Sequence, residues 1–461
     1  MSTSRGGHVW GNDGSWVGSD AQTIARAVTN REVSASQVLD DHLAHIKARN
    51  PELNAVVTVA EDQAIRAADD LDTRIGRGED VGPLAGVPFT VKDLIATAGV
   101  RTTAGSRALE HNVPSVDAPA VTAMRAAGAI LVGKTNTPEF GASGLTHNDL
   151  FGYTVNPLRP DGVARSPGGS SGGEAAAVAS GMSVVGLGTD FGGSVRWPAH
   201  CTGLRSVRPT IGRVDPDGQY PGVPSGDHVL TNPATMHGTL QTIGPMARTL
   251  DDAALVLRVL SSRQYHWTDP ASVDLSRLDV TWAPGDGTVP VDTEIVAAVA
   301  GAAGRLGARP YRGAALSEGN DLFGTLRAVE THTDIIELGT DFGTNIATML
   351  AAARDVDRRL VERLWAQRAE LVHRLLGEMG DVLVLPVASI PAPPLGDELF
   401  DVGGQSLTWS QALASCRAIS VTGLPSVVVP VGSTRSGLPI GVQVVARPWC
   451  EHVALAVAAR L

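Results

Sequence analysis

Two groups of serines and glycines between residues 165 and 199 have the composition of a catalytic loop. The first, GGSSGG, carries Ser170 and Ser171 in overlapping G-x-S-x-G patterns, which mark a nucleophile elbow only when a strand runs into the serine. Residues 156–167 precede it with prolines and charges and do not predict a strand. A P-loop is excluded as well, because Glu174 stands where that motif needs Lys followed by Ser or Thr. The first group therefore lacks the context of a nucleophile.

The second group, DFGGS, has the strand that the first group lacks. The apolar stretch 182–190 runs directly into Phe191, Gly192, Gly193 and Ser194, where the backbone is free to turn and expose a hydroxyl. Two glycines let successive N–H groups converge on one point, as an oxyanion hole requires. Together with a base, a serine at this position and such a donor-lined turn would make an acyl-transfer site.

A nucleophilic serine needs a base, and the chain has only three lysines, Lys47, Lys92 and Lys134. Lys47 lies on an amphipathic helix pattern, whereas Lys92 and Lys134 each follow a buried-strand pattern and could point into a cleft. A lysine in a desolvated place loses its proton more readily and can act as a base near neutral pH. The residues alone leave Lys92 and Lys134 as equal candidates. Histidines that the fold could bring near stay open as well: His147, His200, His237 and His332.

Composition bounds the class of protein. Of 461 residues, 43% are hydrophobic and 18% charged, which is enough apolar material for a large core. A net charge of −11 argues against nucleic acid or an anionic membrane as the partner, since both call for clustered Lys and Arg. With no apolar signal region and no membrane-length apolar run, a cytoplasmic enzyme is expected. The three cysteines have no zinc-site spacing and are expected to be reduced: Cys201, Cys416 and Cys450.

Alternating strand and helix patterns must position these residues. Residues 20–48 predict two helices, with Ser34 as the N-cap of the second. Strands are then expected at 86–93, 129–135, 182–190, 381–387, 424–432 and 440–446, and helices at 118–129, 174–181 and 355–380. This order predicts an α/β fold with a central mixed, largely parallel twisted sheet, covered by helices on both faces.

We expect a single large domain over residues 1–461, with residues 1–20 as an N-terminal arm. Residues 213–242 and 262–345 are the least regular and the richest in Gly, Pro and Asp. Such segments often form lids or pocket walls. We therefore expect both of them to border the substrate pocket.

Six sequence blocks spread over nearly the whole chain form a recognisable set. They are GVPFTVKDLIATAGVRTTAGS (86–106), LVGKTNTPEF (131–140), SPGGSSGGEAAAVASG (166–181), GTDFGGSVRWPAHCTGLRSVRPTIGR (188–213), GPMARTLDDAALVL (244–257) and GLPIGVQVVARPWCEHVALAVAARL (437–461). In this order they resemble the amidase signature family of Ser-Ser-Lys hydrolases, and the resemblance implies that family's fold. The chain departs from the family pattern at Arg208, where many members have a lysine.

The resemblance assigns a role to each serine and lysine. Lys92 would be the base, Ser170 a bridging serine that passes protons, and Ser194 the nucleophile. Lys134 then becomes a structural lysine. A cis peptide bond would join Gly169 to Ser170.

Supporting roles follow from the same resemblance. The backbone N–H groups of the DFGGS turn, from Phe191 to Ser194, would stabilise the oxyanion. Ser171 would hydrogen-bond Lys92 or the loop, and Asp190 with Arg196 would form a buried pair that braces the turn.

The implied activity is hydrolysis of an amide C–N bond, which releases a carboxylic acid and ammonia or an amine. Family members also act on esters and carbamates, so the small-molecule substrate stays open, as does a homodimer. No cofactor and no metal is implied. Two alternatives remain: the amidase subunit of a tRNA-dependent amidotransferase, and a metal-dependent amidohydrolase built on Glu330, His332 and Asp334, whose spacing matches no strong metal motif.

Overall fold

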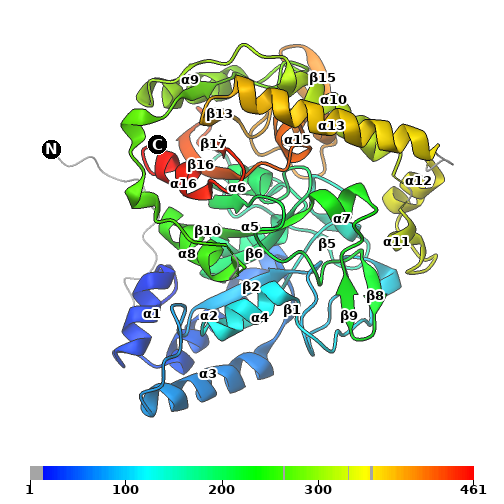
Figure 1. Ribbon diagram of the computed structural model, residues 1–461. Coiled ribbons are helices and arrows are strands. Elements are labelled where there is room, and N and C mark those ends of the chain that lie inside the picture. The colour runs from blue at the N-terminus through cyan, green and yellow to red at the C-terminus, as the bar shows by residue number, and fades with distance from the viewer. Residues whose placement is uncertain (1–13, 263–264, 331, 353–356) are drawn as a thin grey trace.

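An eleven-stranded sheet runs through the centre of the computed structural model, which describes residues 14–262, 265–330, 332–352 and 357–461 (Figure 1). Across the sheet its strands are β1 (Val56–Val59), β3 (Ile130–Thr135), β2 (Pro88–Lys92), β6 (Val185–Asp190), β10 (Thr242–Ala247), β7 (Arg205–Arg208), β16 (Ser426–Ser433), β17 (Pro439–Ala446), β13 (Val382–Pro386), β11 (Val280–Trp282) and β12 (Arg309–Pro310). Three separate strand pairs are β4 (His147–Asn148) with β5 (Gly152–Tyr153), β8 (Val223–Ser225) with β9 (His228–Leu230), and β14 (Leu399–Val402) with β15 (Gln405–Thr408).

Helices surround this sheet. The α-helices are α1 (Ala21–Thr29), α2 (Ala35–Leu53), α3 (Glu61–Gly76), α4 (Pro119–Ala126), α5 (Gly172–Ala179), α6 (Arg196–Thr202), α7 (Met236–Leu240), α8 (Leu250–Leu260), α9 (Thr293–Arg305), α10 (Ala315–Ala328), α11 (Thr333–Ile336), α12 (Thr344–Ala352), α13 (Arg358–Glu378), α14 (Trp409–Ala412), α15 (Ala414–Ser420) and α16 (Glu451–Ala458). Short 3-10 helices are η1 (Arg107–Leu109), η2 (Glu139–Gly141), η3 (Pro270–Ser272) and η4 (Leu275–Arg277).

The expectation of a mixed sheet is confirmed, but the sheet is parallel only in two separate groups of strands. β3, β2 and β6 run parallel to one another, and so do β13, β11 and β12. From β6 through β10, β7, β16 and β17 to β13, every neighbouring pair is antiparallel. The expectation of a largely parallel sheet is therefore wrong for this central part. β16 and β17 illustrate the reason, because a short connection joins antiparallel strands whereas a parallel pair needs a longer crossover.

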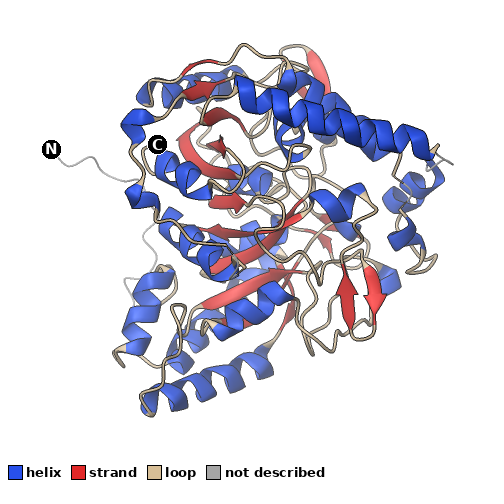
Figure 2. Cartoon of the chain, viewed as in Figure 1, coloured by secondary structure: helices blue, strands red, loops and turns tan. Residues whose placement is uncertain are grey.

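Helices cover both faces of the sheet (Figure 2), and the alternation along β16 separates the two cores. Val427 and Val429 belong to a hydrophobic cluster with buried residues of α8, α9 and α16. Val428, between them, belongs to a second cluster with buried residues of α6. Successive side chains of a strand point to opposite faces, so the two clusters lie on opposite sides of the sheet.

The expected helices and strands mostly form where the sequence predicts them. Ser34 caps α2 through a reciprocal capping box with Gln37, as the pattern indicates. The segment 262–345 is less irregular than expected, because it contains α9 and α10, and the alanine-rich sequence of α9 favours a helix. Residues 213–242 hold the β8–β9 hairpin and the short helix α7. Residues 1–13 of the expected arm, and residues 263–264 and 331 of the second segment, lie outside the described residues.

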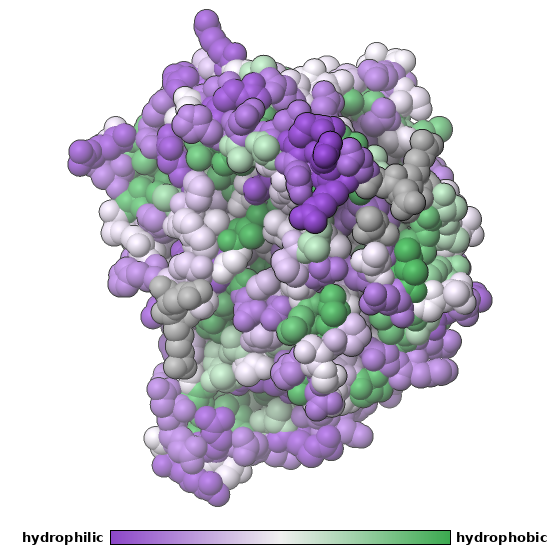
Figure 3. Space-filling model, turned by 45° about the vertical axis from the view of Figure 1, so that its right-hand side comes forward, coloured by the Kyte–Doolittle hydropathy of each residue, from purple (hydrophilic) through white to green (hydrophobic). Residues whose placement is uncertain are grey.

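The surface in Figure 3 mixes hydrophilic and hydrophobic residues, and polar areas separate the apolar ones. α13 has 21 residues, enough length to cross a bilayer, but its sequence is rich in Arg and Glu. Within the described ranges, no helix combines the length and the apolar character that a membrane span requires.

Candidate active site

The predicted catalytic residues meet at one edge of the sheet. Lys92 ends β2 and Asp190 ends β6, and these two strands are parallel neighbours. The carboxyl ends of parallel strands lie at the same edge, so both side chains start from neighbouring positions. Ser170 reaches this edge from the loop before α5, a helix that packs on β2 and β6. Ser194 follows Asp190 in the next turn.

Lys92 is fully buried and hydrogen-bonded to two hydroxyl groups. Its Nζ donates to Oγ of Ser170 at 2.6 Å and to Oγ1 of Thr189 at 2.9 Å. Burial lowers the pKa of Lys92 to about 7, although Asp190 and Glu174 favour its charged form. Near neutral pH, a large fraction of this amine is therefore unprotonated and has a lone pair for a proton.

Ser170 and Ser171 connect the lysine to the nucleophile turn. The peptide bond between Gly169 and Ser170 is cis, as the resemblance implies. The backbone N–H of Ser171 donates to the carbonyl oxygen of Ser194 at 3.2 Å. The hydroxyl of Ser171 donates to the carbonyl oxygen of Thr189 at 3.2 Å. Of the two partners expected for Ser171, the structure thus has the loop and strand end rather than the lysine.

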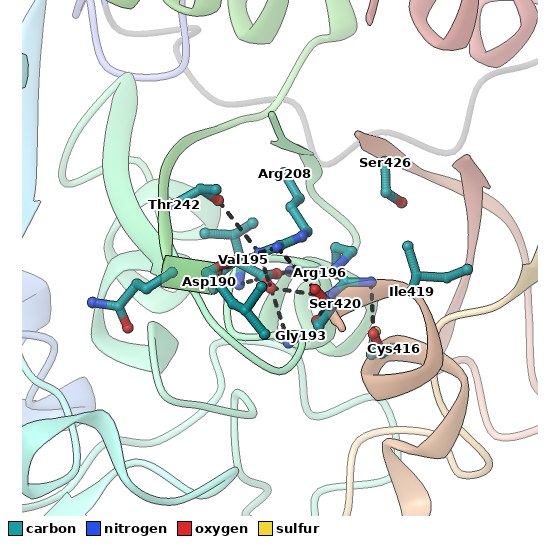
Figure 4. A network of polar contacts seen from close by, with 12 residues as sticks. Asp190, Gly193, Val195, Arg196, Arg208, Thr242, Cys416, Ile419, Ser420 and Ser426 are labelled. Carbon is teal, nitrogen blue, oxygen red and sulfur yellow. Dashed lines mark hydrogen bonds and ion pairs between the residues drawn. The ribbon is translucent and has the colours of Figure 1, made fainter. Parts of the chain in front are cut away.

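The carboxylate of Asp190 is the centre of a buried network that holds the turn (Figure 4). The N–H groups of Gly193 and Val195 donate to it at 3.0 and 3.2 Å. Arg196 donates from Nε and Nη2 at 3.0 and 2.9 Å, and Arg208 donates from Nη1 at 3.2 Å. Burial alone would raise the pKa of Asp190, but the two guanidiniums outweigh burial and hold it well below its ordinary value. The expected pair of Asp190 with Arg196 is confirmed, and Arg208 adds a second cation.

Arg196 also ties the turn to the C-terminal part of the chain. Its Nη1 donates to the carbonyl oxygen of Cys416 at 3.1 Å and to Oε1 of Gln443 at 2.8 Å. Its Nη2 donates to Oγ of Ser420 at 2.6 Å. The position of the nucleophile turn therefore depends on α15 and β17.

The expected oxyanion donors differ in their availability. The N–H of Gly193 is engaged by Asp190, and Gly193 has a φ of +120°, which favours glycine. Within the described residues, the N–H groups of Phe191, Gly192 and Ser194 have no protein acceptor. Of the four N–H groups expected to form the oxyanion hole, these three therefore remain available.

Lys134 lies one strand away, at the end of β3, and makes different contacts. Its Nζ donates to the carbonyl oxygen of Ile95 and to the hydroxyls of Thr97 and Thr102, the latter two at 2.9 and 3.0 Å. Burial lowers the pKa of Lys134 to about 8, and Asp93 opposes this shift. These partners belong to the loop after β2, so the contacts of Lys134 are those of a structural lysine.

A cavity of about 120 Å³ lies beside Ser194. Its lining is Phe140, Gly141, Ala142, Ser143, Gly144, Phe191, Gly192, Ser194, His237, Gln241, Phe323, Arg327, Trp409, Ser410, Leu413 and Arg417. Both expected border segments contribute, through His237 and Gln241 and through Phe323 and Arg327. The β8–β9 hairpin instead lines a separate cavity with α4.

Two residues of the proposed metal site, Glu330 and His332, contact Arg327. Glu330 pairs with Nη1 of Arg327 at 2.5 Å and accepts the backbone N–H of His237 at 2.9 Å. Nδ1 of His332 lies 3.4 Å from Nη1 of Arg327. In the part of the chain that the structure describes, no group of three or more His, Cys, Asp or Glu residues could hold a metal ion.

Sequence reasoning missed Thr189 and the arginines that line the cavity. Successive side chains of a strand point to opposite faces, so Thr189 lies on the face opposite to that of Asp190. This alternation could have identified Thr189 from the sequence. Arg417 belongs to a short helix more than 200 positions after Ser194, and no motif in the sequence connects the two residues.

Comparison with known proteins identifies the class. Its matches place the protein among the hydrolases that act on amide C–N bonds. A family model described as "Amidase" matches residues 37–310 and 328–455. The chain belongs to the amidase signature family.

Individual relatives cover nearly the whole chain. Indoleacetamide hydrolase of Bradyrhizobium diazoefficiens is 34% identical over 469 residues, which cover 97% of this chain and 86% of that protein. A glutamyl-tRNA(Gln) amidotransferase subunit of Synechococcus sp. (strain CC9902) is 32% identical over 484 residues, which cover 93% of both chains. The solved structure of 6-aminohexanoate cyclic dimer hydrolase complexed with substrate matches with a TM-score of 0.79 at 29% identity, and covers 96% of both chains. At comparable identity, the chain is thus similar both to hydrolases and to part of an amidotransferase.

Proposed function

We propose that the protein hydrolyses small-molecule amides through an acyl-enzyme on Ser194, with Ser170 as proton relay and Lys92 as base. The contact between Nζ of Lys92 and Oγ of Ser170, at 2.6 Å in a fully buried place, carries the proposal. Since burial lowers the pKa of Lys92 to about 7, the neutral amine is available at neutral pH. The hydroxyl of Ser170 can then donate to its lone pair across the same contact.

The reaction has two halves. In the first, Oγ of Ser194 bonds to the carbonyl carbon while its proton passes through Ser170 to Lys92. The N–H groups of Phe191, Gly192 and Ser194 take up the charge of the oxyanion, at about 3 kcal/mol per donor. The proton then moves to the nitrogen, the C–N bond breaks, and ammonia or an amine leaves. In the second half, water cleaves the ester, the carboxylic acid is released and Ser194 regains its proton.

A serine-directed sulfonyl fluoride with peptide mapping tests this proposal without knowledge of the substrate. We expect the label on Ser194, and we expect Ser194→Ala to lose both the label and at least about 10⁴-fold of any amidase kcat. Ser180→Ala is the matched control, because its hydroxyl caps α5 by donating to the Ala176 carbonyl oxygen at 2.6 Å. Labelling of any other residue would overturn the assignment of the nucleophile.

A second candidate is the amidase subunit of a tRNA-dependent amidotransferase. The 32% identity with such a protein over 93% of both chains supports it. The net charge of −11 favours the free-standing hydrolase, which needs no nucleic-acid partner. Release of ammonia from amides by the purified chain alone decides between them, since an obligate subunit would be inactive without its complex.

A further inference from the structure

Arg417 of α15 reaches the turn that carries the nucleophile. It lines the cavity beside Ser194. A Cβ atom at Gly192 would lie 3.8 Å from Cγ of Arg417, so the arginine stem passes close to the oxyanion donors. Its guanidinium carbon lies 4.7 Å from the centroid of the Phe323 ring. A small molecule whose carbonyl meets Ser194 would extend within reach of this cation.

The charge of Arg417 has no counter-ion in the described parts of the chain. Nη1 donates to the carbonyl oxygen and the hydroxyl of Ser410 at 3.2 and 2.6 Å, and both of these acceptors are neutral. No carboxylate among the described residues forms an ion pair with it, and its Nε and Nη2 donate to no described protein acceptor. Burial, reinforced by Arg327, lowers the pKa of Arg417 to about 10, and Asp286 opposes this shift. A desolvated cation without a partner costs free energy, which an anionic ligand would recover.

The other arginines around the site each form an ion pair with a carboxylate. Arg327, which also lines the cavity, pairs with Glu330 at 2.5 Å. Arg196 and Arg208 share the carboxylate of Asp190. Among the described residues, Arg417 therefore differs from these arginines in two ways: its Nε and Nη2 have no acceptor, and its charge has no carboxylate partner.

We propose that the substrate is an amide with a short chain that carries a carboxylate, and that Arg417 binds this carboxylate. The inference rests on the proposed acyl-enzyme function and names its substrate class. Nε and Nη2 of a guanidinium form the fork that binds a carboxylate through two parallel hydrogen bonds, and these are the two unused donors. The cavity of about 120 Å³ has room for a short carbon chain, which the rings of Phe191, Phe323 and Trp409 would contact.

Two matched substrate pairs test this binding. Succinamate is compared with butanamide, and N-acetylglycine with N-ethylacetamide, so that each pair exchanges a carboxylate for a methyl group. We expect the wild-type protein to prefer the charged member of at least one pair by about 10-fold or more in kcat/KM. Arg417→Gln should lower kcat/KM for that member by about 10- to 100-fold, chiefly through KM, and leave its neutral partner nearly unchanged. Arg417→Lys should keep part of the preference.

Arg101→Gln is the control variant. Arg101 is also partly buried, lies over an aromatic ring at 5.4 Å from the centroid of Phe151, and is not among the residues that line the cavity. Its loss should leave the preference intact. If Arg417 only braces α14 through Ser410, both members of each pair lose activity equally in Arg417→Gln, and the proposal is wrong.

A readout on the wild-type protein covers the case in which Arg417→Gln fails to fold. Succinate should slow the sulfonyl fluoride labelling of Ser194 at concentrations at which butanamide does not. Equal protection by the two compounds, or no preference within either substrate pair, would overturn the substrate class while leaving the acyl-enzyme proposal intact. The acyl-enzyme proposal fails separately, if Ser194 takes no label at all.

Discussion

Lys92 is the last residue of β2, and Lys134 is the last but one of β3, its parallel neighbour; both side chains are fully buried. Burial lowers the pKa of both, to about 7 and about 8. Their partners differ: Lys92 donates to the hydroxyls of Ser170 and Thr189, whereas Lys134 donates to a backbone carbonyl and two threonines of the loop after β2. A desolvated lysine is thus no sufficient sign of a base, because the identity of its acceptor decides whether a proton can be passed on.

Of the changes at the two lysines, Lys92→Met should cause the largest loss of activity. Without the amine, no group accepts the proton of Ser170, so we expect kcat for amides to fall by about 10⁴-fold, the upper range for a general base. Steady-state kinetics measure the fall, and a retained thermal transition shows that the fold persists. A loss of less than tenfold would mean that another group is the base.

The pH dependence should separate the two lysines next. Lys92 accepts a proton only when neutral, so kcat/KM should be constant well above pH 7 and fall by about tenfold per pH unit below its pKa of about 7. The same profile in Lys134→Met would attribute the titration to Lys92. A midpoint that moves in Lys134→Met would show that the two lysines are coupled.

The smallest effect on catalysis is expected from Lys134→Met itself. This change removes three hydrogen bonds and the cation that partly offsets the burial of Asp93. We expect the free energy of unfolding to fall by about 1–3 kcal/mol, as for other buried polar groups that lose a partner. The kcat should change by no more than about threefold, since Lys134 touches none of the proposed catalytic residues. Denaturant unfolding and kinetics on the same preparation measure both quantities.

The sequence was sufficient for most elements around the site. The buried strands that carry Lys92, Lys134 and Asp190 at or next to their last residue are clear from apolar runs, and Ser34 marks the start of α2. The antiparallel centre of the sheet was not predictable in this way, because the periodicity of a strand carries no information about its neighbour's direction. The helix α9 was missed because its surroundings are rich in Gly, Pro and Asp, which obscured a run of alanines.

Local motifs identified parts of the site, but its long-range contacts could not be predicted from the sequence. The DFGGS turn and the GGSSGG loop could be identified from glycine and serine spacing, but their spacing left the choice between the two lysines open. The engagement of the Gly193 N–H by Asp190 and the approach of Arg417 to Gly192 depend on packing between distant segments. Such contacts have no periodic or compositional signal in a single sequence.

The guanidinium of Arg196 joins the nucleophile turn to Cys416, Ser420 and Gln443, which are translated more than 200 residues after it. During synthesis, every proposed catalytic residue has been incorporated by Ser194, yet the partners of Arg196 in α15 and β17 are still to come. A chain shortened before residue 416 would therefore contain the lysine, both serines and the Asp190 network, but not the contacts that tie the turn to α15 and β17. The full set of contacts around the nucleophile turn is thus a property of the nearly complete polypeptide.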